Sequence, residues 1–94
     1  MRRLHIGPAM SRRFGGYGLS RNALVRFLAT LRFDIENNYQ HYHMRRHPED
    51  PRYFTYYLAI ADATITHRFY FVIDDSTTPE DLFIANLQHE QGSG

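Results

Sequence analysis

The chain contains no cysteine and no lysine, and it has no long hydrophobic run. Without cysteine it can form neither a disulfide nor a cysteine-based zinc or nucleophile site. No apolar run approaches the roughly 20 residues that span a bilayer. The basic residues at the start are not followed by a hydrophobic stretch of signal-peptide length. We therefore expect a cytoplasmic protein without a membrane segment.

The absence of lysine leaves arginine as the only strongly basic residue type. Arginine suits planar recognition of phosphate or carboxylate groups, although a GC-rich genome produces the same bias. The charges are also uneven along the chain. Residues 1–47 hold nine Arg and two acidic residues (9 − 2 = +7), whereas residues 48–94 hold two Arg and eight acidic residues (2 − 8 = −6). This asymmetry indicates an acidic or polyanionic partner, unless the fold interleaves the two halves and cancels the field.

The hydrophobic content and the length of the chain are those of one packed domain. The 94 residues are 43% hydrophobic and include seven Tyr and seven Phe, which argues for a core rather than disorder. This length fits one domain and is too short for two independent cores. We assign residues 1–90 to a single domain and residues 91–94 to a flexible tail.

A long helix is the clearest predicted element. Ser20 can cap its start, and an apolar stripe at helical spacing follows. The stripe consists of Leu24, Phe27, Leu28, Leu31 and Ile35. The pair at residues 37–38 predicts a break that would make the segment a helical hairpin, and Pro48 ends it. Before the helix, the glycine-rich residues 14–18 predict a flexible loop.

Beyond the prolines the hydrophobic period changes to two. This change predicts strands at residues 53–61, 65–73 and 82–89, joined by short polar connections, and residues 2–6 predict a further strand before the helix. The predicted fold class is therefore α+β. It consists of an N-terminal strand, a helix or helical hairpin, and a three-stranded antiparallel meander, forming one sheet packed on the helices.

Three segments of the chain carry the pattern of a known family. The opening Arg2-Arg3-Leu4-His5-Ile6-Gly7-Pro8-Ala9 is similar to a first strand that runs into "xPxA". The segment His67-Arg68-Phe69-Tyr70-Phe71-Val72-Ile73-Asp74-Asp75 is similar to a central "YRxxYxxDD" strand. The segment Leu82-Phe83-Ile84-Ala85-Asn86-Leu87-Gln88-His89 is similar to a terminal "xxVxxxxH" strand. In this order, and in a chain of this length, they resemble the RelE/ParE toxin superfamily.

The resemblance implies a toxin of a type II toxin–antitoxin system, held inactive by a cognate antitoxin laid over it. RelE-type members enter the ribosome and cleave mRNA, whereas ParE-type members poison DNA gyrase without known chemistry of their own. We expect inhibition of translation by ribosome-dependent mRNA cleavage. The alternative is a non-enzymatic toxin or binding module that inhibits gyrase or binds another protein. No cofactor is expected in either case.

By the same resemblance, Arg68 and His89 form the central catalytic pair, and Tyr70 shares a sheet face with Arg68. Attack by a 2′-hydroxyl on phosphate needs an acid or base, which would be His89, and a cation for the developing charge, which would be Arg68. A second acid or base would be Glu49 or Asp50. The expected RNA-binding residues are Arg45, Arg46 and Arg52.

Structural alternatives stand beside these roles. Arg68 would equally form an ion pair with an acid on a neighbouring segment, namely Asp62, Asp74 or Glu80, and His89 would equally be an exposed strand end. The group of His41, His43 and His47 favours a solvated polar helix end over a metal site, so no metal is expected. The strands also carry more aromatic residues than one helix can cover. The outward Tyr side chains would stack bases, receive an antitoxin helix or pair with a second copy of the chain.

Overall fold

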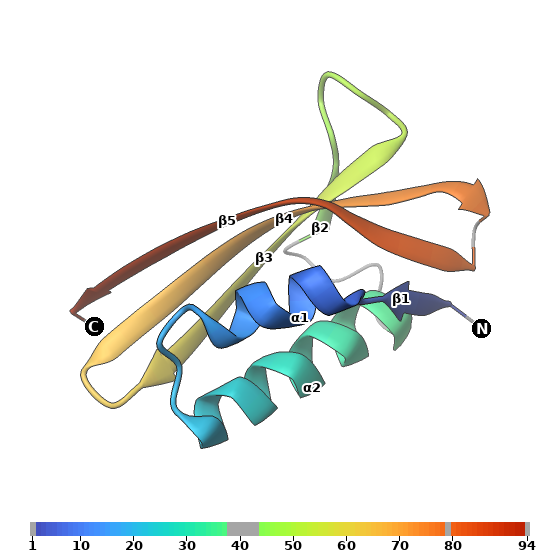
Figure 1. Ribbon diagram of the computed structural model, residues 1–94. Helices are drawn as coiled ribbons and strands as arrows, with labels where there is room; N and C mark the ends of the chain where they lie inside the picture. The colour runs from blue at the N-terminus through green and yellow to red at the C-terminus, as the bar shows by residue number, and fades with distance from the viewer. Residues whose placement is uncertain (1, 38–43, 79, 94) are drawn as a thin grey trace.

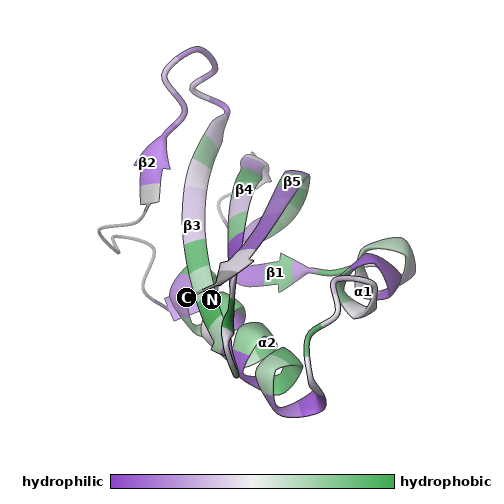
Figure 2. Ribbon diagram, turned by 90° about the vertical axis from the view of Figure 1, so that its left-hand side faces the viewer, coloured by the Kyte–Doolittle hydropathy of each residue, from purple (hydrophilic) through white to green (hydrophobic). Residues whose placement is uncertain are grey.

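The described residues fold as a strand, two helices and four further strands (Figure 1). The structure, a computed structural model, describes residues 2–37, 44–78 and 80–93. Its elements are β1 (Arg3–His5), α1 (Pro8–Gly15), α2 (Arg21–Asn37), β2 (Met44–Arg46), β3 (Tyr53–Asp62), β4 (Ile65–Thr78) and β5 (Asp81–Ser93). Both helices lie on the same side of the sheet, so that they cover one sheet face, and no described helix lies on the other (Figures 1 and 2).

The five strands form one mixed sheet in the order β1-β5-β4-β3-β2. β2 through β5 pair antiparallel with their neighbours, whereas β1 lies parallel to β5, with Leu4 opposite Leu82. The predicted fold is therefore wrong, because it lacked β2 and the parallel pair. Residues 44–46 have neither β-branched side chains nor alternating polarity, so nothing local marks them as a strand. They form a strand because they pair with residues 54–56 of β3.

The first helix, α1, was not predicted. Pro8 stands in its first turn, where a missing backbone N–H costs no hydrogen bond. Phe14 is buried near its end and packs edge-on against Phe27 of α2, with ring centroids 5.0 Å apart. Gly18 has a φ of 81°, a backbone conformation that glycine adopts without strain. The glycine-rich segment, predicted as a flexible loop, therefore ends one helix and turns the chain into the next.

Ser20 caps α2 as predicted. Its hydroxyl oxygen accepts a hydrogen bond from the backbone N–H of Ala23 at 3.2 Å. Its own N–H and hydroxyl donate to the Asp62 carboxylate at 2.7 and 2.9 Å, which holds the pKa of Asp62 below its usual value. The helix ends at Asn37. The predicted second helix of a hairpin falls largely on residues 38–43, which lie outside the described residues, and the segment that follows them is β2.

The predicted apolar stripe of α2 is confirmed as the centre of the core. Phe27, Leu31 and Ile35 are fully buried, and Leu24 and Leu28 pack at the edge of the same cluster. Figure 2 shows this apolar side of α2 turned toward the strands. A buried polar contact joins the two layers, because the Tyr56 hydroxyl donates a hydrogen bond to the Asp34 carboxylate. Burial and this partner raise the pKa of Tyr56.

β4 and β5 form a long hairpin that extends beyond the predicted strands. Gln91 and Gly92, assigned from the sequence to a flexible tail, pair with His67 and Thr66 of β4. A register shift in β5 next to Val72 leaves one extra residue there, as in a β-bulge. No described helix is long and apolar enough to cross a membrane.

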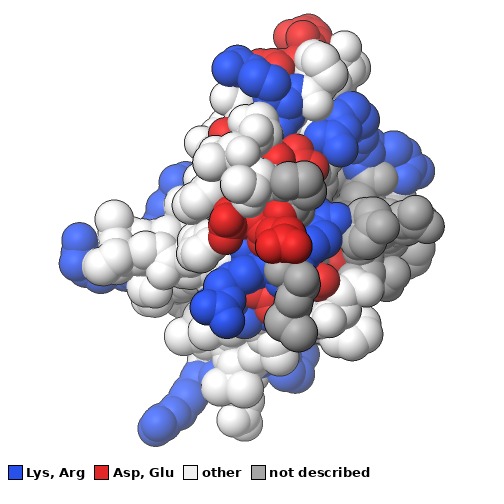
Figure 3. All heavy atoms as spheres, turned by 90° about the vertical axis from the view of Figure 1, so that its right-hand side faces the viewer, with Lys and Arg blue, Asp and Glu red and all other residues white. Residues whose placement is uncertain are grey.

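The fold interleaves the two oppositely charged halves of the chain. β1, from the basic half, lies beside β5 from the acidic half, and His5 of β1 contacts the Asp81 carboxylate at 2.8 Å. Arg46 of β2 contacts Asp75 of β4 at 3.2 Å. Figure 3 shows acidic side chains beside basic ones on the side of the molecule where β1 begins. The fold therefore places part of the basic half of the chain against acidic residues of the other half.

Candidate functional site

The uncovered face of the sheet carries a groove of about 370 Å³. By "uncovered face" we mean the side chains of β3, β4 and β5 that point away from the helices: Tyr53, Thr55, Tyr57, Ala59, Thr66, Arg68, Tyr70, Val72, Asn86, Gln88 and Glu90. The groove is lined by nine of the described residues: His47, Thr55, Tyr56, Tyr57, Tyr70, Phe71, Val72, Asn86 and Gln88. None of these residues is Asp, Glu, Lys or Arg, and aromatic and amide side chains make up most of the lining.

Two tyrosines from neighbouring strands form the centre of this groove. Tyr57 of β3 lies directly opposite Tyr70 of β4, and their rings are 5.2 Å apart with a tilt of 39°. Tyr70 is 38% exposed although it lies in the middle of the sheet. The period of two in β3 separates the adjacent tyrosines: Tyr56 is buried under α2, and Tyr57 faces outward. The sequence predicted outward-facing Tyr side chains on these strands, and Tyr57 is one of them.

Arg68 and Tyr70 lie on this face, as the strand pattern predicts. Arg68 stands opposite Ala59 on one side and opposite Glu90 on the other. Its Nη1 lies 3.8 Å from the position that a Cβ on Gly92 would occupy, so the guanidinium lies over that glycine. Among the described residues, no carboxylate forms an ion pair with Arg68, and the alternatives with Asp62, Asp74 or Glu80 are not what the structure shows.

His89 lies on the covered face, apart from Arg68 and Tyr70. It stands opposite Phe69, whose side chain is fully buried under the helices. Its Nε2 shares a hydrogen bond of 2.9 Å with Nδ1 of His67, and its ring lies 4.3 Å from that of Tyr17. Adjacent residues of a strand point to opposite faces. The predicted catalytic pair is therefore separated by the sheet itself, because Arg68 is in register with Glu90 and not with His89.

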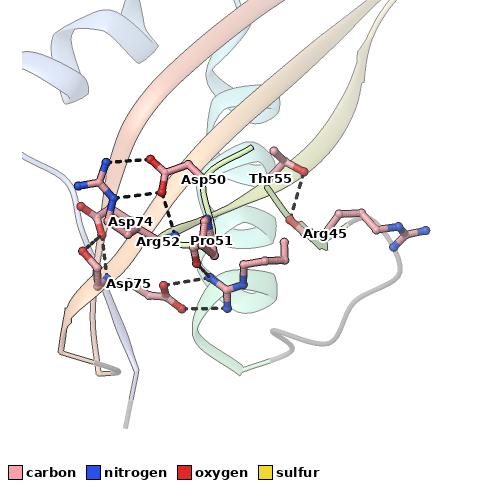
Figure 4. A network of polar contacts seen from close by, with 9 residues as sticks. Arg45, Asp50, Pro51, Arg52, Thr55, Asp74 and Asp75 are labelled. Carbon is pink, nitrogen blue, oxygen red and sulfur yellow. Dashed lines mark hydrogen bonds and ion pairs between the residues drawn. The ribbon is translucent and has the colours of Figure 1, made fainter. Parts of the chain in front are cut away.

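The three arginines expected to bind RNA lie around β2 and the β2–β3 loop (Figure 4). Arg52 forms a two-pronged contact with Asp50, at 3.0 and 2.8 Å, which lowers the pKa of Asp50 to about 2. Arg46 contacts Asp75 through both terminal nitrogens. Arg45 lies opposite Thr55, whose hydroxyl donates to the Arg45 carbonyl at 3.3 Å. Two of the three cations thus already have carboxylate partners.

The described residues contain no group of three or more side chains suited to hold a metal ion. Of the three clustered histidines, His41 and His43 lie outside the described residues. His47 belongs to the loop after β2, and its Nδ1 accepts hydrogen bonds from the backbone N–H groups of Glu49 and Asp50 at 3.1 and 3.2 Å. The predicted polar helix end is therefore a strand and a loop here. Asp50, an expected acid or base, is engaged with Arg52.

The contact between His67 and His89 was not predicted from the sequence, although the alternation of β4 places His67 among apolar residues. Burial of His89, and secondarily the charge that His67 carries when protonated, lower the pKa of His89. We expect the His89 ring to titrate below the usual midpoint of about 6.5. The free energy of unfolding therefore depends on pH. It is highest above about pH 6.5 and falls as the pH drops from there toward the pKa of His89 in the folded protein. In this window the unfolded chain binds a proton that the folded chain does not bind.

NMR titration of the imidazole signals measures this midpoint directly. A His67→Gln variant removes the electrostatic effect of His67 and leaves most of the burial of His89. It should move the titration midpoint of His89 partly back toward the usual value. A His89 midpoint at or above about 6.5 in the folded wild-type protein contradicts this arrangement.

No protein family, curated protein or solved structure matches this chain. The site is therefore defined by its geometry: an aromatic, uncharged groove on the uncovered face of a five-stranded sheet, with Arg68 beside it and the buried His67–His89 pair on the opposite face.

Proposed function

We propose that this protein is the toxin of a toxin–antitoxin pair and that it acts by binding a protein target through the uncovered face, without catalysis of its own. The toxin role is supported by the order and spacing of the three segments that resemble the RelE/ParE superfamily. The binding role is supported by one observation above all, the open groove around Tyr57 and Tyr70.

The chemistry of the groove favours a protein over a nucleic acid as the target. Tyrosine with Asn and Gln is the composition of adaptable protein-binding surfaces, in which rigid aromatic rings supply contact area and the amides supply hydrogen bonds. Asn86 and Gln88 stand next to Val72 and Tyr70 in this groove. Nucleic acid binding would instead depend on cations available to phosphates, and Arg46 and Arg52 already contact carboxylates.

The position of His89 argues against mRNA cleavage by the expected pair. A general acid or base must come within about 3 Å of the atom whose proton it moves. A phosphate held by Arg68 would lie on the uncovered face, whereas the His89 ring packs against Tyr17, Phe69 and His67 on the covered face. Of the other residues expected to act in catalysis, Tyr70 lies on the same face as Arg68 and His89 does not.

The proposal is tested by inducing the chain alone in a bacterial host and following growth. We expect growth arrest with the wild-type protein. A Tyr57→Ala/Tyr70→Ala variant should relieve the arrest, because loss of a central aromatic contact typically weakens binding by about 2 kcal/mol or more, roughly 30-fold. His89→Gln should remain toxic. In a purified translation system the wild-type protein should leave mRNA intact, and in a purified gyrase assay it should inhibit supercoiling.

A Val25→Ala change provides the matched control, since Val25 is 61% exposed on the side of α2 that faces away from the sheet. It should not alter toxicity. Unimpeded growth with soluble, folded wild-type protein would sink the toxin role. Cleaved mRNA, with loss of toxicity in His89→Gln, would sink the non-catalytic mechanism instead.

A further inference from the structure

The outer edge of β5 is covered along only part of its length. β1 pairs with residues 81–83 of β5, and the strand continues to Ser93 with β4 on its other side. Figure 1 shows this distal half of β5 at the margin of the sheet, with no further described strand beside it; α1 lies close to it on the covered side and reaches the Leu87 carbonyl through Arg13. An exposed strand edge presents backbone N–H and C=O groups that can pair with another chain.

The structure shows which backbone groups face this edge. The Leu87 carbonyl accepts a hydrogen bond from the Arg13 side chain at 2.6 Å, and the Leu87 N–H donates to the Asn86 side-chain oxygen at 2.9 Å. Leu87 thus points its backbone groups outward, and both are occupied by side chains. In an antiparallel strand this direction alternates, so the next residues to face outward are His89 and Gln91. No hydrogen bond from a described residue occupies their backbone groups on that side.

The charges beside this edge are arranged to complement a second copy. Arg68 and Glu90 lie opposite each other on the uncovered face, but the described residues give neither side chain an ion pair. The guanidinium of Arg68 lies over Gly92, two residues further along the edge strand. A glycine there leaves the space above the backbone open toward the edge, where an incoming carboxylate would meet the guanidinium.

We propose that two copies of this chain pair through β5, antiparallel and centred on Gln91, to form one continuous sheet across both copies. In this register Gln91 faces Gln91 of the second copy, and the two residues exchange two backbone hydrogen bonds. Glu90 of each copy faces Gly92 of the other, beside Arg68. Each dimer therefore contains two Arg68–Glu90 ion pairs between copies, related by the twofold axis. This interface is separate from the groove, so the proposed function does not depend on it.

The contribution of the Arg68–Glu90 ion pairs to dimerisation is tested by sedimentation of the purified protein over a series of concentrations, without any other protein present. Wild-type protein should dimerise. Arg68→Glu and Glu90→Arg should each weaken the dimer about tenfold or more, because each places like charges across the interface. The double change Arg68→Glu/Glu90→Arg should restore it. Wild-type protein that stays monomeric throughout the series, or single changes without effect on a dimer, would overturn the proposal.

The register is tested by a single cysteine, which the cysteine-free sequence makes unambiguous. Residues exchanging backbone hydrogen bonds have Cα atoms about 5.5 Å apart, within the range that a disulfide spans. Gln91→Cys should therefore crosslink rapidly under mild oxidation, whereas Val25→Cys, on the exposed side of α2, should not. Equal crosslinking of the two variants would contradict pairing at Gln91. As a second measure, Gln91→Pro removes the outward N–H and should give monomer, while Gln91→Ala should remain dimeric.

Discussion

Replacing Phe27 with alanine is expected to lower the free energy of unfolding by about 3–5 kcal/mol. The Phe27 side chain is completely buried, and its ring lies 5.0 Å from that of Phe14, 4.4 Å from that of Phe69 and 6.2 Å from that of Phe71. It therefore joins α1, α2 and β4 at one point. Since domains of this kind are stabilised by only about 5–15 kcal/mol, the loss should be visible in urea denaturation followed by circular dichroism.

Phe33→Ala is the matched control for this change. Phe33 lies on the same helix, loses the same atoms and is 60% exposed. Its replacement should leave the free energy of unfolding within about 0.5 kcal/mol of the wild-type value. Equal destabilisation by the two changes would contradict the assigned orientation of α2, and with it the identification of the covered and uncovered faces of the sheet.

Replacing Tyr56 with phenylalanine is expected to destabilise the protein by about 1–3 kcal/mol, although it removes a single oxygen. The hydroxyl donates to the Asp34 carboxylate, and both side chains are buried, at 1% and 7% exposure. Without that donor the carboxylate remains buried with one fewer partner, which costs more than the hydrogen bond itself contributes. Thermal unfolding at constant pH measures the effect.

A double change distinguishes this cause from a general packing defect. Asp34→Leu/Tyr56→Phe removes both polar groups and should recover much of the lost stability, because apolar replacement of both partners of a buried pair is often close to neutral. If the double variant is less stable than Tyr56→Phe alone, the penalty does not come from the stranded carboxylate. The neighbouring Tyr57→Phe change, on the uncovered face, should have little effect on stability in the same measurement.

The two tyrosines also show how the fold and the proposed function are connected. Tyr56 ties the sheet to α2, whereas Tyr57 opens onto the groove, and only the strand period separates them. The Asp34–Tyr56 contact thus supports the orientation of β3 that turns Tyr57 toward the groove. A variant that destabilises the covered face should weaken binding through loss of folded protein, whereas Tyr57→Ala/Tyr70→Ala should weaken binding in protein that stays folded.

The features that depend on a local hydrophobic period could be predicted from the sequence. The 3.6-residue stripe predicted which side of α2 is buried, and Ser20 predicted where the helix starts, since a cap acts on its own first turn. The alternation in residues 65–73 placed Arg68 and Tyr70 together on one face, and His67 on the other, because side chains alternate along any strand.

Which segments pair, and in which register, could not be predicted in the same way, because pairing depends on contacts between distant parts of the chain. β2 is a strand because β3 lies beside it, and the parallel pairing of β1 with β5 joins segments from opposite ends of the chain. The register of β5 turns His89 toward the helices, since a shift of one residue in pairing reverses the face of every side chain. The carboxylate contacts of Arg46 and Arg52 differ in this respect. Of these two contacts, Arg52–Asp50 joins residues two positions apart, whereas Arg46–Asp75 joins residues 29 positions apart and forms only when the sheet brings β2 and β4 together.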